Sequence, residues 1–436
     1  MTRSRTITQT IGSVGLLIGL GTAAAPVAGD CDIWSAFGGG AGVQVYSVIE
    51  YEGDLVILGT FSTVDGMQIP GIAAWDGTSW YPLGDGLLVA LIDGEPQVGV
   101  FDGDLVVTGE LIPNSVGFYQ PAFRWDGSAW DTFGDQQCDG APSVGSLTIY
   151  EGDLIVGLRL TGACEHHTNG FDDPISGVLR WNGEYWSQVG DTSDFHRVRA
   201  LTVFEGDLIA GDDLGAIRRW DGESWELIGQ MDDQILTFTE YNGDLITGGR
   251  FTEADGLTVN QIARWTGEHW VAMAGGVGGV SDPRVNTLVV FNDELIAGGD
   301  FTSAGGQSAD NIARWTGAGW EEFEGGANNR VHAAAPFGDG LAVGGSFTSL
   351  GGVSATRVGM FTPCLGPPIG ACCVNGNCIE VDEQFCATIG GAYLGDETFC
   401  DDTDCPPACP ADLNSDGVVD VLDLLMVLEA WGACPD

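Results

Sequence analysis

The chain has 436 residues, of which 69 are Gly and 44% are apolar, so it is long enough to bury a large core. Its formal net charge is −47, and all 15 basic residues are Arg. Phosphate backbones and anionic lipids are bound by basic surfaces, so this charge argues against nucleic-acid and anionic-membrane partners. It favours an acidic, well-solvated surface.

The first 29 residues have the pattern of a secretory signal peptide. Arg3 and Arg5 precede an apolar run at residues 11–20, and small residues follow up to Gly29. A membrane-spanning helix needs about 20 apolar residues, and neither this run nor any later segment approaches that length. We therefore expect cleavage near Ala28 or Gly29, secretion to an extracellular or cell-surface location, and disulfide bonds among the 12 cysteines.

A short turn recurs seven times along the next 300 residues. Five copies have the form Glu/Asp/Asn-Gly-Asp-Leu, and two are looser. The leucines that end the copies are Leu55, Leu105, Leu154, Leu208, Leu245, Leu295 and Leu341, spaced 50, 49, 54, 37, 50 and 46 residues apart. Short strands and Gly turns with a period of about 40–50 residues are typical of β-propeller blades. We therefore predict seven blades.

Each repeat has the pattern of four strands. In the copy at residues 285–320, alternating and β-branched residues predict strands over 285–291, 295–301 and 311–315, and a fourth from Trp320. Gly, Asp and Asn residues separate these segments, as is typical of tight turns. The fold class that we expect is all-β.

Two kinds of side chain recur in step with the repeats. Trp-x-Gly-x-x-Trp pairs occur at Trp75/Trp80, Trp125/Trp130, Trp181/Trp186, Trp220/Trp225, Trp265/Trp270 and Trp315/Trp320. An Arg precedes the first Trp of five pairs, at Arg124, Arg180, Arg219, Arg264 and Arg314. Because both follow the blade period, we interpret the Trp rings as filling between blades rather than a sugar-stacking platform. We interpret the Arg residues as structural partners of the turn carboxylates rather than an anion-binding ring.

The N-terminus carries one strand too many and the last repeat one too few. Trp34 begins a segment that matches the fourth-strand segment starting at Trp320, whereas the seventh repeat stops near Phe361. The N-terminal strand can therefore complete the last blade and close the ring, leaving no open sheet edge. Cys31 and Cys364 flank this junction, and we expect a disulfide between them.

The repeats resemble kelch-type repeats over about residues 31–363. The features that carry the resemblance are the double glycines (Gly248-Gly249, Gly298-Gly299, Gly344-Gly345), the Gly-x-Phe-Thr that follows, and the later Trp pair. They are more similar still to the kelch-like propeller repeats of fungal cortical polarity-marker proteins and of secreted bacterial proteins. The resemblance implies binding or scaffolding. A few such propellers catalyse, as galactose oxidase does, but its copper-site residues cannot be assembled here, so we predict no catalytic or cofactor-binding residues.

Blades two to four depart from the repeat, at residues 110–120, 161–177 and 205–225. This divergence marks either a functional edge or neutral decay. The second segment contains Cys164, His166, His167, Asp172 and Asp173. These residue types can hold a transition metal, but Cys164 has an expected disulfide partner in Cys138, and we favour the disulfide.

A cysteine-rich segment follows the repeats. Six cysteines lie within 34 residues, at Cys372, Cys373, Cys378, Cys386, Cys400 and Cys405. So short a segment cannot build an ordinary core, so we expect disulfides to stabilise it, with zinc as the less favoured alternative. Six cysteines allow fifteen pairings, which stay open.

Residues 412–423 fit the twelve-residue calcium loop. The predicted Ca²⁺ ligands are Asp412, Asn414, Asp416, Val418 through its carbonyl, Asp420 and Asp423, and Gly417 supplies the sharp turn. An Asp in the last position, followed by an apolar helix at 424–431, resembles a dockerin type I repeat. That resemblance implies a cohesin-like protein partner. Dockerins carry two such loops and this chain carries one, while Cys409 and Cys434 are placed to staple it.

The sequence therefore predicts four parts: a signal peptide (1–29), a kelch-like propeller (30–363), a cysteine-rich module (364–408) and a dockerin-like calcium module (409–436). We expect a secreted, non-enzymatic binding or scaffold protein, whose propeller loops bind a polysaccharide or a protein. Two alternatives remain. One is a polysaccharide-active enzyme, a glycoside hydrolase or lyase with two carboxylates about 5–9.5 Å apart in one cleft. The other is a structural surface or matrix protein.

Overall fold

The structure, a computed structural model, describes residues 32–89, 95–109, 111–113, 121–134, 137–138, 143–159, 164–165, 176–363, 369–374, 377–388, 392–395 and 400. The chain divides into two compact units, Met1–Thr362 and Pro363–Asp436. The expected signal peptide, the Cys31–Cys364 pair, the calcium loop and the Cys409–Cys434 pair lie outside the described residues.

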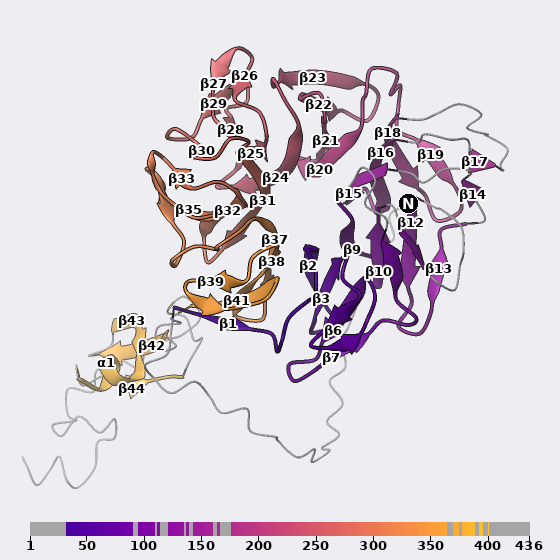
Figure 1. Cartoon of the computed structure of the whole chain (residues 1–436). Helices are drawn as coiled ribbons and strands as arrows, with labels where there is room; N and C mark the ends of the chain where they lie inside the picture. Colours follow the sequence, from indigo (N-terminus) through magenta and orange to yellow (C-terminus); the bar gives the residue numbers. More distant parts are fainter. Residues whose placement is uncertain are drawn as a thin grey trace, which may run out of the picture. The chain divides into compact units, whose positions relative to one another are not determined.

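Within the described part of the first unit there are seven four-stranded antiparallel sheets (Figure 1). Sheet 1 contains β2 (Val45–Tyr51), β3 (Asp54–Gly59), β6 (Ile72–Trp75) and β7 (Trp80–Pro82). Sheet 2 contains β9 (Gln97–Phe101), β10 (Asp104–Thr108), β12 (Ala122–Trp125) and β13 (Trp130–Thr132). Sheet 3 contains β15 (Ser143–Tyr150), β16 (Asp153–Arg159), β18 (Ser176–Trp181) and β19 (Trp186–Gln188). Sheet 4 contains β20 (Val198–Phe204), β21 (Asp207–Asp212), β22 (Ala216–Trp220) and β23 (Trp225–Gln230).

The remaining sheets continue this order. Sheet 5 contains β24 (Ile235–Tyr241), β25 (Asp244–Gly249), β28 (Ile262–Trp265) and β29 (Trp270–Ala272). Sheet 6 contains β31 (Arg284–Phe291), β32 (Glu294–Asp300), β35 (Ile312–Trp315) and β36 (Trp320–Glu322). Sheet 7 contains β37 (Val331–Phe337), β38 (Gly340–Gly345), β41 (Val358–Thr362) and, outermost, β1 (Ile33–Ala36). In that last pairing Trp34 lies opposite Phe361.

The sheets are arranged as in a β-propeller. The first strand of each sheet contacts the first strand of the next, and β37 of sheet 7 contacts β2 of sheet 1. The hydrophobic core lies between adjacent sheets: one cluster joins Leu55 and Ile57 of sheet 1 to Ala342 and Val358 of sheet 7. The prediction of an all-β, propeller-type fold is confirmed.

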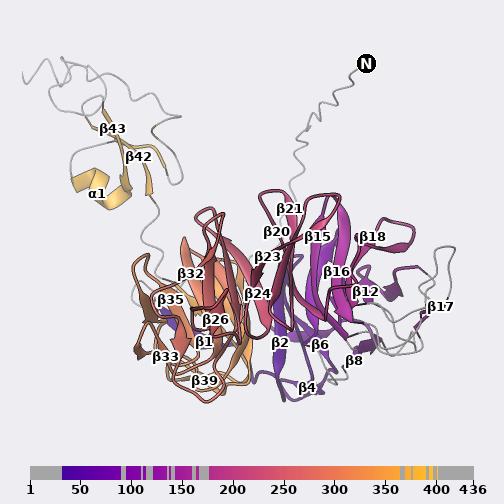
Figure 2. The same cartoon turned by 90° about the horizontal axis from the view of Figure 1, so that it is seen from above.

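Small hairpins gather at one side of the ring, which we call the hairpin face (Figure 2). They are β4–β5 (Thr63–Val64, Met67–Gln68), β26–β27 (Glu253–Ala254, Leu257–Thr258), β33–β34 (Ser303–Ala304, Gln307–Ser308) and β39–β40 (Ser349–Leu350, Val353–Ser354). Strand β30 (Val277–Gly278) pairs with β33, β8 (Leu87–Val89) with β11 (Leu111–Pro113), and β14 (Gln137–Cys138) with β17 (Cys164–Glu165). First strands begin and second strands end at the hairpin face.

The recurring turn lies at the face opposite the hairpin face. Its sequence suits a two-residue hairpin loop. In sheet 1, Tyr51 pairs with Asp54, so Glu52 and Gly53 form the loop, with φ of 52° and 89°. Two consecutive positive φ angles match the twist of the flanking strands, and a Gly at the second position adopts such an angle without strain. From Leu55 onward, the second strand that follows is buried on both faces and accordingly apolar.

The second Trp of each pair links one sheet to the one before. The buried Trp80 donates its indole N–H to the carbonyl of Phe37, at 3.1 Å, and Trp130 donates to Leu83, at 3.0 Å. Equivalent bonds come from Trp186, Trp225, Trp270 and Trp320, and Trp34 makes the corresponding bond to Glu324. The structural interpretation of the Trp residues is therefore confirmed.

The five repeated Arg residues also have structural partners. Each lies within ion-pair distance of a carboxylate of its own sheet's turn: Arg124 with Asp104, Arg180 with Asp153, Arg219 with Asp207, Arg264 with Asp244 and Arg314 with Glu294. The predicted Arg–carboxylate pairs are confirmed. About a third or more of each Arg side chain is exposed, so each pair contributes at most about 1 kcal/mol to stability.

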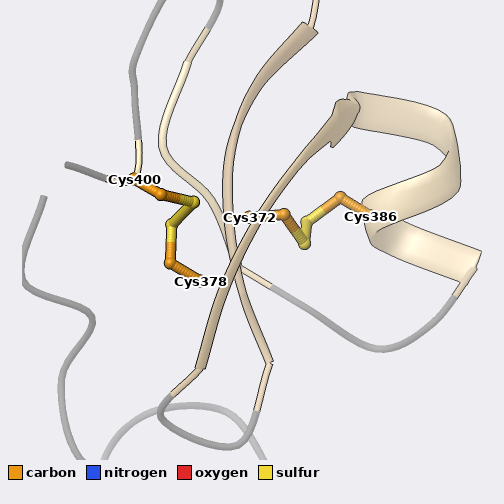
Figure 3. The surroundings of a disulfide bond; sticks show 4 residues. All are labelled: Cys372, Cys378, Cys386 and Cys400. Atoms are coloured by element: carbon orange, nitrogen blue, oxygen red, sulfur yellow. A yellow bond between two sulfur atoms is a disulfide. The ribbon is translucent and has the colours of Figure 1, made fainter.

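The described part of the second unit is a small disulfide-bonded fold. It contains β42 (Ile369–Val374), β43 (Asn377–Asp382), α1 (Glu383–Thr388) and β44 (Ala392–Tyr393). Disulfides join Cys372 to Cys386 and Cys378 to Cys400, and Cys373 is also disulfide-bonded (Figure 3). The disulfide interpretation is confirmed for these residues, and two of the open pairings are now assigned.

Candidate functional site

A central cavity is the candidate site. It has a volume of about 250 Å³ and is lined by residues of all seven first strands, together with Glu95, which precedes β9. Since each sheet contributes only two or three residues, the chemistry of the cavity depends on which side chains those positions carry.

Six of the seven described first strands contain a β-bulge near their start. In each, the register shifts between an aliphatic residue and the residue two positions later, so the intervening residue is left out of the ladder. These bulged residues are Tyr46, Gly145, Arg199, Leu236, Asn286 and His332, and all six line the cavity. A bulge commonly redirects a side chain, and here it does so at equivalent places around one ring.

The bulged position varies while its neighbours do not. The preceding residue is Val or Ile in every case, with no exposed surface. The following residue is small: Ser47, Ser146, Ala200, Thr237, Thr287 and Ala333. The chain's own repeats thus keep the flanking residues aliphatic and small and vary the bulged residue most. We call the six bulged residues the bulge ring.

His332 is the most enclosed polar member of the bulge ring, with only 3% of its side chain exposed. Its Nε2 lies 3.0 Å from Ser346 Oγ, and its Nδ1 lies 3.3 Å from Glu95 Oε1. The ring also packs against Tyr46, with centroids 4.7 Å apart. His332 therefore connects sheet 7 to sheet 1 and to the residue that precedes sheet 2.

Glu95 is the carboxylate of this cavity. Burial raises its pKa, but the close contact with His332 and the charges of Arg199 and Arg330 act in the opposite direction, and the net effect holds the pKa below its ordinary value. Burial and the negative charge of Glu95 also raise the pKa of Tyr46. The carboxylate is therefore ionised at neutral pH, and 40% of its side chain is accessible to water within the cavity.

The divergent sheet 4 carries a second group of charges on the hairpin face. Arg197 pairs with Asp213 at 3.3 Å and donates to Ser143 Oγ of sheet 3 at 3.1 Å. Arg218 pairs with Asp212 at 3.2 Å and lies over the ring of Phe195. In sheet 4 the residue aligned with the buried Phe251 of sheet 5 is Leu214, which is 61% exposed, so these ion pairs accompany the loss of that packing.

The residues predicted to bind calcium, and most of those considered for a transition metal, fall outside the part of the chain that the structure describes. The calcium ligands Asp412, Asn414, Asp416, Val418, Asp420 and Asp423 lie outside the described residues, as do His166, His167, Asp172 and Asp173. Cys138 and Cys164 lie directly opposite each other in the β14–β17 ladder. Among described residues, no group of three or more His, Cys, Asp or Glu is arranged to hold a metal ion, and none of the described helices is long and apolar enough to cross a membrane.

The bulge ring itself was missed by sequence reasoning. Its signal is the recurring pattern of an aliphatic residue, any residue, a small residue and an apolar residue at the start of six of the seven repeats, as in residues 45–48 and 285–288. Aligning the repeats on this pattern, rather than on the Gly-Asp-Leu turn alone, isolates the variable position.

No family model matches the chain, and no curated protein matches it. Among solved structures, it is similar to the computationally designed Ika8 protein, with 13% identity and a TM-score of 0.46 over 74% of this chain and 98% of that chain. It is also similar to YCF48 bound to a D1 peptide (12% identity, TM-score 0.45, 77% and 97% covered). The third is the WD40 β-propeller domain of Doa1 (14% identity, TM-score 0.42, 76% and 96% covered). At this distance none of the three names a ligand for the chain.

Proposed function

We propose that the chain is a secreted, non-enzymatic binding protein built on a seven-bladed, kelch-like propeller closed by its N-terminal strand. The observation that carries the proposal is the bulge ring, in which six variable positions, five of them with side chains, line one cavity. The packing around each bulge is constant, so the ring combines a rigid frame with changeable contacts, as binding sites generally do. The pairing of β1 with β41 supports the closure.

In this proposal the C-terminal module docks or anchors the protein through calcium. The support is the twelve-residue loop with Asp412, Asn414, Asp416, Asp420 and Asp423 as oxygen ligands. A cohesin-like protein is the partner implied by the dockerin resemblance, and Ca²⁺ is the only cofactor proposed.

Removing calcium is expected to loosen residues 409–436 alone, because the predicted ligands all lie in that segment and metal binding there is coupled to folding. Hydrogen exchange measured with and without chelator should rise in the segment and stay constant in the propeller. Unchanged exchange at 409–436 would count against the calcium module.

Ligand binding is tested with the purified mature chain, calcium present, and a panel of soluble polysaccharides. We expect retention of at least one polysaccharide, and at least tenfold weaker retention by Tyr46→Ala or Asn286→Ala, whose side chains line the cavity. Tyr185→Ala is the matched control, because Tyr185 is 41% exposed and does not line the cavity. Equal loss in all three variants would contradict binding at the bulge ring.

One observation favours a second enzymatic alternative, an acyl hydrolase, which differs from the glycoside hydrolase or lyase with two carboxylates. His332 contacts Ser346 on one side and Glu95 on the other, as the base contacts the nucleophile and the orienting acid in acyl hydrolases. Ser346 does not line the cavity, which favours instead a role in orienting His332. The same incubations are assayed for reducing ends, which report cleavage of the polysaccharide, and for acetate, which reports removal of acetyl groups. Release of either product would mean that the chain is a hydrolase rather than a binding protein. If neither retention nor product appears, the ligand is a protein or the chain is a structural protein. The next experiment would then use the C-terminal module to capture a protein partner.

A further inference from the structure

Glu95 enters the cavity differently from the six bulged residues. It precedes β9, which pairs with β10 in unbroken register from Gln97 to Phe101. Among the seven described first strands, β9 is therefore the one without a bulge. At the position where sheet 2 lacks a bulged side chain, the chain instead places a carboxylate in the cavity. That carboxylate reaches His332, which belongs to sheet 7.

We propose that Glu95 occupies a carboxylate-binding site within the cavity, and that the ligand of this site is a small polar carboxylate, of the uronic acid type, which replaces the Glu95 side chain. The inference rests on the proposed function, because it names the ligand class of the same cavity. It makes Glu95 an internal competitor for that ligand.

The charges around Glu95 carry the first step of the argument. The chain has a net charge of −47, so most of its surface repels an anion. Within the cavity the charge balance is different: His332 and Arg199 line it and stabilise the ionised form of Glu95, whereas Arg330 lies outside the lining and pairs with Asp300. Groups that hold one carboxylate in this way can hold another of the same geometry.

The position of His332 carries the second step. Ser346 Oγ lies 3.0 Å from Nε2, and Nδ1 lies toward Glu95. Tyr46 packs on the ring and limits its rotation. The imidazole is therefore held in place independently of Glu95, so removing that side chain leaves a formed site.

The size and polarity of the cavity carry the third step. A volume of about 250 Å³ is below the usual range for ligand pockets, so it suits one sugar unit, either a free monosaccharide or the end unit of a polysaccharide. Tyr46, Gln97 and Asn286 line it, and Asn286 Nδ2 donates to the Val331 carbonyl at 2.7 Å, which directs its Oδ1 as an acceptor. Hydroxyl groups on the ligand match these side chains.

The test compares Glu95→Ala with the wild-type full-length mature chain by isothermal titration at low ionic strength. Glucuronate is the probe, glucose its neutral counterpart, and acetate the bare carboxylate. We expect Glu95→Ala to bind glucuronate at least tenfold more tightly than wild type, with no gain for glucose. Adding His332→Phe to Glu95→Ala should abolish the gain. Glu95→Gln, which keeps the shape and removes the charge, is used if Glu95→Ala does not fold, and it should show the same direction.

Three outcomes would overturn the inference: no gain for glucuronate in either Glu95 variant, an equal gain for glucose, or a gain for acetate without one for glucuronate, which is an adventitious ion only. In each case the proposed function is judged separately, by whether Tyr46→Ala still weakens retention in the polysaccharide panel. If Tyr46→Ala changes nothing and no probe binds, both proposals fail.

Discussion

Replacing Trp34 by Ala is expected to lower the free energy of unfolding of the propeller by about 3–5 kcal/mol. Trp34 is 5% exposed, and its ring packs against Phe323 and Phe361, with centroids 5.9 Å and 5.4 Å away. Its indole N–H donates to the Glu324 carbonyl at 2.8 Å. The substitution therefore removes a large buried ring and leaves a carbonyl without its donor, at the strand that joins the two ends of the propeller.

Ile33→Ala is the control, because Ile33 lies in the same strand and is 40% exposed. Its effect should stay within about 0.5 kcal/mol. Urea unfolding followed by Trp fluorescence reports on the propeller, since 13 of the 14 Trp residues precede residue 363. If the two variants have the same midpoint, β1 is not needed to complete sheet 7.

The repeated features could be predicted because each is set by local chemistry. Glu52-Gly53 adopts a two-residue turn from its own backbone preferences, and the copies of that turn place the strands on either side. Arg180 and Asp153 are only 27 residues apart and lie in adjacent strands of one hairpin unit. A residue that recurs once in every blade contacts the same kind of neighbour in each blade. Its structural role can therefore be inferred from its spacing in the sequence.

The candidate site could not be predicted in the same way, because it is formed where the period is broken. A bulge adds one residue to a strand, so alternation alone assigns Tyr46 and Asn286 to the wrong side of the ladder. Glu95 meets His332 only because the ring brings sheets 7, 1 and 2 together, and its own position precedes the one first strand without a bulge. No local pattern connects two residues so far apart in the sequence.

The disulfide pairing was likewise beyond the sequence. Cys372 and Cys373 are adjacent in β42, so their side chains point to opposite faces of the sheet and reach different partners. Which face meets Cys386 depends on where α1 packs, and the contacts of α1 with β42 and β44 settle this only in the folded unit.

Replacing both Cys372 and Cys386 by Ala is expected to unfold the second unit while the propeller stays intact. Cys372 and Cys386 have no exposed surface, and with Ala371 they make up most of the buried residues described in this unit. A unit with so few buried side chains depends on its cross-links, and loss of one such disulfide typically costs about 2–5 kcal/mol. Removing both cysteines avoids leaving a free thiol that can exchange with the Cys378–Cys400 disulfide.

Hydrogen exchange over residues 369–395 is the measurement, with Ile379→Ala as control, because Ile379 lies in β43 and is 39% exposed. Protection of β42 and β43 should be lost in the double variant and retained in the control, and the urea midpoint of Trp fluorescence should be the same in both. Retained protection in the double variant would mean that the Cys378–Cys400 disulfide and the disulfide of Cys373 are enough to keep the unit folded without Cys372–Cys386. A lowered urea midpoint would mean that the two units do not fold independently, since the change lies entirely beyond Thr362.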